Sequence, residues 1–190
     1  MAAEYSKVLG KAITDSTLEG LPEHVGKTIT QRDRAKAATR LSIGGGVFTV
    51  CLVHNLTGDT VTYVGYHVWD VPDVHPSFKD IENGQTAIFM QGRTKGTAVV
   101  YRGKNAQRDE CDIMLAWYNV SWDGKAVNKV YTEIHEANHF NNDTVWDAIN
   151  KQLDVSAENN TSVWNGCVST ASISTGASPT LNAYFTLADA

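Results

Sequence analysis

The sequence predicts a mainly β protein, a single antiparallel β-sandwich with peripheral α-helices. From residue 47 onward, short runs of β-branched and aromatic residues recur about every 10 to 15 residues. Turns rich in Gly, Asn and Asp separate these runs, and most neighbouring runs have no helical pattern between them. Parallel βαβ folds need a helix between successive strands, so the pattern disfavours Rossmann and TIM-barrel classes. A length of 190 residues fits one domain over residues 1–190.

The composition of the chain indicates which partners and which compartment to expect. The chain has 16 Lys plus Arg against 21 Asp plus Glu, a net charge of −5, which disfavours a nucleic-acid partner. Hydrophobic residues make up 42% of the chain, enough for a core. The sequence contains no apolar run of membrane-spanning length, and its N-terminus lacks the apolar stretch of a secretory signal. We therefore expect a cytoplasmic protein.

The first 42 residues read as a polar helical leader. Thr30 and Asp33 form a capping-box pattern at the start of a helix whose apolar stripe is narrow. Gly44 to Gly46 follow and are interpreted as a hinge, because no Gly-Lys-Ser/Thr sequence follows them as a phosphate loop requires. The sandwich is expected over residues 47–190.

Six strands are predicted next, and the turn at residues 57–59 is interpreted as a hairpin joining the first two. A late helix is predicted near residues 142–154, with Trp146, Ile149 and Leu153 on its apolar face. Two more runs, 162–174 and 181–188, each have strand composition. The six strand predictions cover residues 47–56, 60–69, 86–92, 97–103, 111–120 and 128–137.

The cysteines Cys51, Cys111 and Cys167 include no CxxC pair, and two of them lie in strand-like runs. They are predicted to be buried apolar residues. Whether any two of them pair is left open by the sequence.

His135, Glu136 and His139 satisfy the HExxH spacing of zinc peptidases. That motif needs a helix, which places both histidines on one face. Here it ends a strand-like run, in which residues four apart lie about 13 Å from each other. We therefore predict no metal site, no cofactor and no catalytic residue, and keep a zinc-dependent hydrolase only as an alternative.

Two other chemical patterns are weak. His67, Asp70, Asp73 and His75 offer metal-ligand atoms in a loop, but such donors are common in polar turns. No G-x-S-x-G nucleophile motif occurs in the chain.

The remaining feature is aromatic. Rings gather around predicted strand ends, where they could stack on a sugar face or meet a lipid headgroup. The residues predicted to bind a ligand are Tyr66, Trp69, Trp117, Tyr118 and Trp122.

Several long strings in the chain resemble the plant 23 kDa jasmonate-induced protein family. The resemblance implies a stress- or hormone-responsive plant protein and brings no established catalytic activity with it. Family members tend to carry Arg at the position of His135, which weakens the zinc alternative. The strings are ITQRDRA (29–35), LVHNLTGDTVTYV (52–64), IENGQ (81–85), AVVYRGKN (98–105), EIHEANHF (133–140), WNGC (164–167) and the final FTLADA.

A second, patterned similarity is to actinoporin and aegerolysin sandwiches, through Asn55, Thr57, Gly58, Tyr101 and the aromatic strand at 117–122. This similarity implies lipid-headgroup recognition at the aromatic strand end. We therefore expect a non-enzymatic module that binds a glycan or a lipid headgroup, with peripheral membrane contact. A pore-forming, cytolysin-type defence protein is the alternative, and the oligomeric state is left open.

Overall fold

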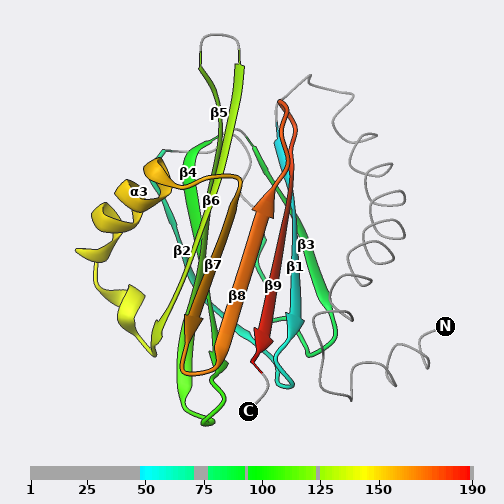
Figure 1. The fold of residues 1–190 in the computed structure, drawn as a ribbon, viewed down its shortest axis with the longest axis vertical. Coiled ribbons are helices and arrows are strands. Elements are labelled where there is room, and N and C mark those ends of the chain that lie inside the picture. The colour runs from blue at the N-terminus through cyan, green and yellow to red at the C-terminus, as the bar shows by residue number, and fades with distance from the viewer. Residues whose placement is uncertain (1–47, 71–76, 93, 123–124, 189–190) are drawn as a thin grey trace, which may run out of the picture. The chain divides into compact units, whose positions relative to one another are not determined.

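The computed structural model describes residues 48–70, 77–92, 94–122 and 125–188, so the predicted leader and hinge lie outside it. The described residues form two packed β-sheets with one α-helix, which confirms the predicted β-sandwich (Figure 1). The strands are β1 (Phe48–Leu56), β2 (Thr62–Val68), β3 (Thr86–Gly92), β4 (Thr94–Lys104), β5 (Glu110–Trp122), β6 (Lys125–Glu136), β7 (Asn159–Trp164), β8 (Cys167–Ile173) and β9 (Thr180–Leu187).

The first sheet has the strand order β3-β1-β9-β8-β7 and the second the order β2-β4-β5-β6. All neighbouring strands pair antiparallel except β1 and β9, which are parallel. The prediction of a purely antiparallel sandwich is wrong at this one pair. A parallel pair needs a crossover connection, and here the whole second sheet and the helix lie between the two strands in sequence.

The predicted hairpin between the first two strands is also wrong, because β1 and β2 belong to different sheets. The Asn55 side chain holds the turn: its amide donates to the carbonyl oxygens of Asp59 and Ile81, each at 2.7 Å. Its Oδ1 accepts from the backbone N–H and the hydroxyl of Thr57. The chain is thereby redirected across the sandwich, and β3 returns to pair with β1.

The run at 162–174 is two strands, where the sequence predicted one. Asn165 and Gly166 have φ values of 46° and 75° and form a tight turn between β7 and β8. Asn-Gly favours this left-handed backbone, since it suits a two-residue hairpin.

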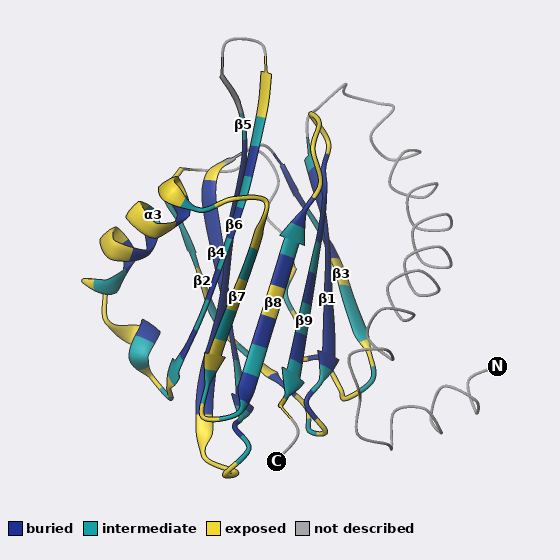
Figure 2. Cartoon of the chain, in the orientation of Figure 1, coloured by how far each residue is buried: buried dark blue, intermediate teal, exposed yellow. Residues whose placement is uncertain are grey.

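The main core lies between the sheets and takes alternate residues from most of the strands. Figure 2 shows the buried stretches along these strands. All three cysteines belong to this core with 0% of their surface exposed, and all are free thiols, which confirms their predicted burial.

A second apolar cluster covers the outer face of the β2-β4-β5-β6 sheet. It is formed with α3 (Val145–Val155), whose Trp146, Ile149 and Leu153 are buried against the sheet as predicted. Within the described part of the chain, no helix is long and apolar enough to cross a bilayer.

The two long sides of the sandwich differ. On one side the edge strands β6 and β7 are tied by hydrogen bonds from the backbone N–H groups of Thr132 and Ile134 to the side chains of Asn160 and Ser162. On the other side the edge strands are β2 and β3, and aromatic side chains lie between them.

Candidate functional site

A β-bulge in β2 gathers three rings at the β2–β3 side. The register shifts between Tyr63, which pairs with Tyr101, and Gly65, which pairs with Val100. Tyr63 and Tyr66 therefore pair opposite residues that both face the inner core. Phe78 lies beside both tyrosines, with ring centroids 5.5 Å from Tyr63 and 5.9 Å from Tyr66. The Tyr66 side of this group reaches solvent, with 49% of the residue exposed.

These rings continue into the core as a row. Phe78 contacts Phe89 of β3 edge to face, with ring centroids 4.8 Å apart. Phe89 in turn lies 5.9 Å from the ring of Trp117 in β5. Tyr66, Phe78, Phe89 and Trp117, which we call the aromatic row, thus lead from an exposed tyrosine to a tryptophan with 0% exposure.

The inner end of the row holds polar atoms without partners among the described residues. The indole N–H of Trp117 donates no hydrogen bond, and the hydroxyls of Thr97 and Thr49 have no partner. Thr97 is the register partner of Trp117, and Thr49 lies two residues before Cys51, the register partner of Phe89. A buried polar group left unpaired costs about 1–3 kcal/mol, so such groups normally pair with protein groups or ordered water. The hydrogen-bonding groups of Thr49, Thr97 and Trp117 are therefore unused within the described residues.

Two of the five predicted ligand-binding residues lie elsewhere, on the outer face beneath α3. Trp69 and His67 pack against Trp146, with the His67 ring stacked on Trp146 at 4.4 Å. Tyr118 is 8% exposed in the same cluster, and Lys129 lies over its ring.

The predicted residues are therefore split. The structure places Tyr66 and Trp117 in the aromatic row, and Trp69 and Tyr118 across the sheet from it. Trp122 is the last residue of β5, and its side chain is not among those that the structure describes. Phe78 and Phe89 were missed, because only the fold shows that a loop residue links two edge strands. In the loop predicted to offer metal ligands, His67 stacks on Trp146 beside Trp69. Residues 71–76 of that loop lie outside the described residues.

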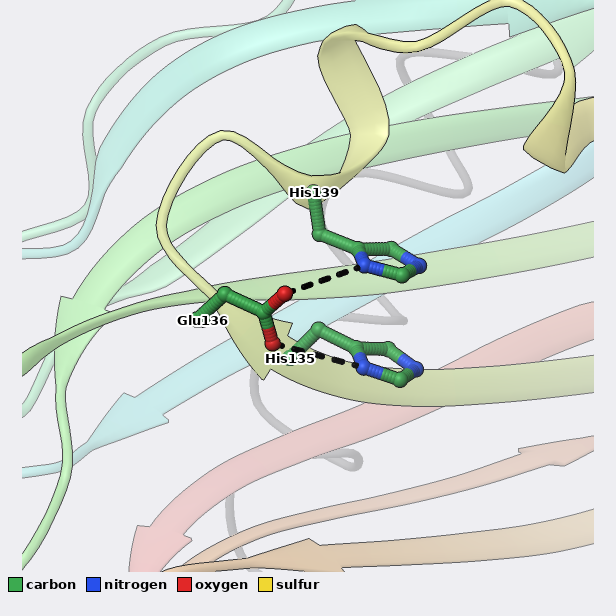
Figure 3. Close-up of side chains that lie close together, drawn as sticks. All are labelled: His135, Glu136 and His139. Carbon is green, nitrogen blue, oxygen red and sulfur yellow. Dashed lines mark ion pairs between the residues drawn. The ribbon is translucent and has the colours of Figure 1, made fainter.

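A second group of candidate side chains lies at the end of β6, where His135, Glu136 and His139 come together (Figure 3). The two imidazole rings are stacked, with centroids 3.8 Å apart and planes 6° apart. The prediction that these histidines lie about 13 Å apart is wrong. The strand ends at Glu136, and a turn carries His139, at the start of the 3₁₀ helix η1 (His139–Asn141), back over His135.

A partly buried ion pair stabilises that turn. The fully buried carboxylate of Asp112 binds the guanidinium of Arg102 at 2.8 Å and accepts a hydrogen bond from the backbone N–H of Asn138 at 2.7 Å. Arg102 also donates to the Asn138 side chain. Asn138 has φ 72°, a left-handed backbone that Asn tolerates better than most residues. The hydrogen bond with Asp112 raises the pKa of Arg102, so the guanidinium stays charged.

The carboxylate of Glu136 faces both rings. Its oxygens lie 3.8 Å from Nδ1 of His135 and 3.5 Å from Nδ1 of His139. A hydrogen bond to its own backbone N–H, followed by the contact with His139, lowers the pKa of Glu136, so the carboxylate is ionised at neutral pH.

Comparison with known proteins shows which family this chain resembles. A family model described as Nakanori-like protein matches residues 39–188. The chain is 32% identical over 210 residues to the 23 kDa jasmonate-induced protein of Hordeum vulgare, covering 94% of this chain and 95% of that protein. The family resemblance read from the sequence is confirmed.

Among solved structures, the chain is similar to the lipid binding protein Nakanori, whose crystal structure was determined at 1.5 Å. The TM-score is 0.65 and the identity 20%, over 93% of this chain and 89% of that one, so this likeness supports the fold. Since the family model spans all the described strands and the barley protein aligns over nearly the whole chain, this chain belongs to the Nakanori-like protein family.

Proposed function

We propose that this protein binds a lipid headgroup at the β2–β3 side of its sandwich, in a stress response linked to jasmonate, without acting as an enzyme. The observation that carries the proposal is the aromatic row, which joins the exposed Tyr66 to the unpartnered indole N–H of Trp117. The lipid-binding description of Nakanori and the jasmonate-induced relative support it.

In this proposal, the ring faces and the polar atoms contact different parts of the ligand. Tyr66 and Phe78 offer apolar ring surface near solvent, suited to the apolar part of a headgroup or of a sugar. Thr97 and Trp117 offer hydrogen-bonding groups deeper in the sandwich, where low polarity strengthens each hydrogen bond. Because none of these groups is charged, binding is expected to change little with salt concentration.

The test is co-sedimentation of the protein with vesicles that differ only in headgroup, with a soluble glycan array as the parallel arm. We expect one headgroup class to retain the protein at both low and high salt. Binding only to glycans would replace the lipid proposal with a sugar-binding one. Release of trapped dye from the same vesicles would instead support the pore-forming alternative.

Two variants locate the site. Tyr66→Ala removes a ring that is half exposed, so we expect an intact fold and a loss of vesicle affinity of about 3- to 10-fold. Val64→Ala is the matched control, since Val64 is exposed on the same strand at the bulge. Equal loss in both variants, or in neither, contradicts the placement of the site.

A further inference from the structure

We propose that His135, Glu136 and His139 form a binding site for a divalent transition-metal ion of the zinc class. One ligand atom from each residue lies within 4.8 Å of the others. Nδ1 of each histidine is 3.5 to 3.8 Å from a Glu136 oxygen. A tetrahedral ion with bonds of about 2.05 Å needs ligand atoms about 3.4 Å apart. The two distances belong to different carboxylate oxygens, Oε2 for His135 and Oε1 for His139, and the two rings are stacked. Coordination of one ion therefore requires these partly exposed side chains to rotate until their ligand atoms converge.

A neighbouring carboxylate prepares His135 as a ligand. Nε2 of His135 lies 2.7 Å from Oε1 of Glu133, two residues earlier on the same face of β6. A carboxylate only accepts hydrogen bonds, so we assign the ring proton to Nε2. In the neutral ring, Nδ1 then carries a lone pair, and this lone pair faces the carboxylate of Glu136 (Figure 3). Two acceptors that face each other favour a cation between them. A carboxylate behind a ligating histidine is also the usual support of zinc sites.

The cluster is held in place from behind. Phe140, which is buried, contacts the ring of His139 edge to face at 5.0 Å and that of His135 at 5.9 Å. The Asp112–Asn138 hydrogen bond fixes the turn between the two histidines. The backbone that carries the three ligands is therefore preorganised by the fold, which lowers the ordering cost of binding an ion.

The chemistry of the ligands selects the ion. Two imidazoles and one carboxylate suit zinc, cobalt, nickel or copper, whereas magnesium and calcium prefer oxygen ligands alone. In a helical HExxH motif the Glu activates a metal-bound water. Here Glu136 faces both rings and serves as a ligand, so the arrangement supports binding of an ion that ties the end of β6 to η1.

The test uses the full chain without an affinity tag, treated with chelator and then titrated calorimetrically with Zn²⁺, with Co²⁺ absorption as a second readout. We expect one ion per chain and no comparable binding of Mg²⁺. Glu136→Gln and His139→Gln remove ligands, so we expect them to weaken binding at least about tenfold, the lower bound for loss of a group that only supports a ligand. Glu133→Gln is expected to weaken it about 10- to 100-fold through His135. Glu158→Gln, a change at an exposed glutamate outside the cluster, is the matched control and should bind as the parent does.

Circular dichroism checks that each variant is folded. The proposal is overturned if the parent protein binds no Zn²⁺ at micromolar concentrations. It is equally overturned if the folded double variant with His135→Gln and His139→Gln binds Zn²⁺ as tightly as the parent, because the ion then lies elsewhere in the chain. Vesicle binding is measured separately, so either outcome leaves the lipid proposal to its own test.

Discussion

His54 lies on β1 with 5% of its surface exposed, its ring stacked on Tyr184 and its Nδ1 2.8 Å from the hydroxyl of Thr86. Burial lowers its pKa from the ordinary 6.5 to about 4. As pH falls below 6.5, the unfolded chain binds a proton at this residue before the folded protein does. Stability that is fully present at neutral pH is therefore lost between about pH 6.5 and pH 4.

We predict that this residue alone contributes a loss of about 2 kcal/mol in the free energy of unfolding between pH 7.5 and pH 5. His54→Gln keeps a polar partner for Thr86 and removes the titration, so its urea-unfolding free energy should fall less over the same interval. If parent and variant lose the same amount, His54 takes up a proton as readily in the folded protein as in the unfolded chain, and its pKa is not lowered by burial.

Two residues show why the site is only partly predictable from sequence. Tyr66 could be identified as an exposed ring on a strand, because aromatic residues beside polar ones at a strand end are visible in the sequence. Its link to Trp117 could not, since it depends on Phe78 and on a bulge that changes which side Tyr66 faces. Asn138 is a similar case: its left-handed backbone reverses the chain and defeats a distance argument based on a regular strand.

At the scale of elements, the β7–β8 turn depends on Gly166. Its φ is +75°, and a Cβ there would lie 2.5 Å from Cβ of Ala106. We predict that Gly166→Ala lowers the free energy of unfolding by more than about 2 kcal/mol, from backbone strain plus this clash. Chemical denaturation measures the loss.

Gly176→Ala separates the two causes. Gly176 also has positive φ, +100°, but no atom lies within 4 Å of a Cβ built there. Backbone strain alone should lower the free energy of unfolding of Gly176→Ala by about 1–2 kcal/mol. Equal losses in the two variants would show that the contact with Ala106 adds nothing.

Most strands and α3 could be predicted, because their period-two or helical patterns are strong and local. Their partners could not. The redirection of β1 away from β2 depends on hydrogen bonds from Asn55 to Asp59 and to the distant Ile81, and no local pattern encodes the second of these. The parallel pairing of β1 with β9 likewise joins residues over a hundred positions apart.

At the scale of the whole molecule, the reactivity of the three thiols measures whether the core between the sheets stays closed. Cys51, Cys111 and Cys167 all have 0% exposure within the cluster between the sheets, and burial raises the pKa of Cys51 well above its usual range. We predict that no thiol reacts rapidly with an aromatic disulfide reagent in the folded protein, whereas all three react after denaturation. Rapid reaction of one thiol in the native state would show that the sandwich opens locally.

The central claim is that the aromatic row receives a polar headgroup at its inner end. The most direct measurement follows the indole N–H resonances in ¹⁵N-labelled protein while a soluble headgroup analogue is added. The account predicts a large shift for Trp117 Nε1–H, reduced in Tyr66→Ala, with little change for Trp146, which belongs to α3 and packs on the outer face of the β2-β4-β5-β6 sheet. Saturable binding that leaves the Trp117 resonance unmoved would contradict it.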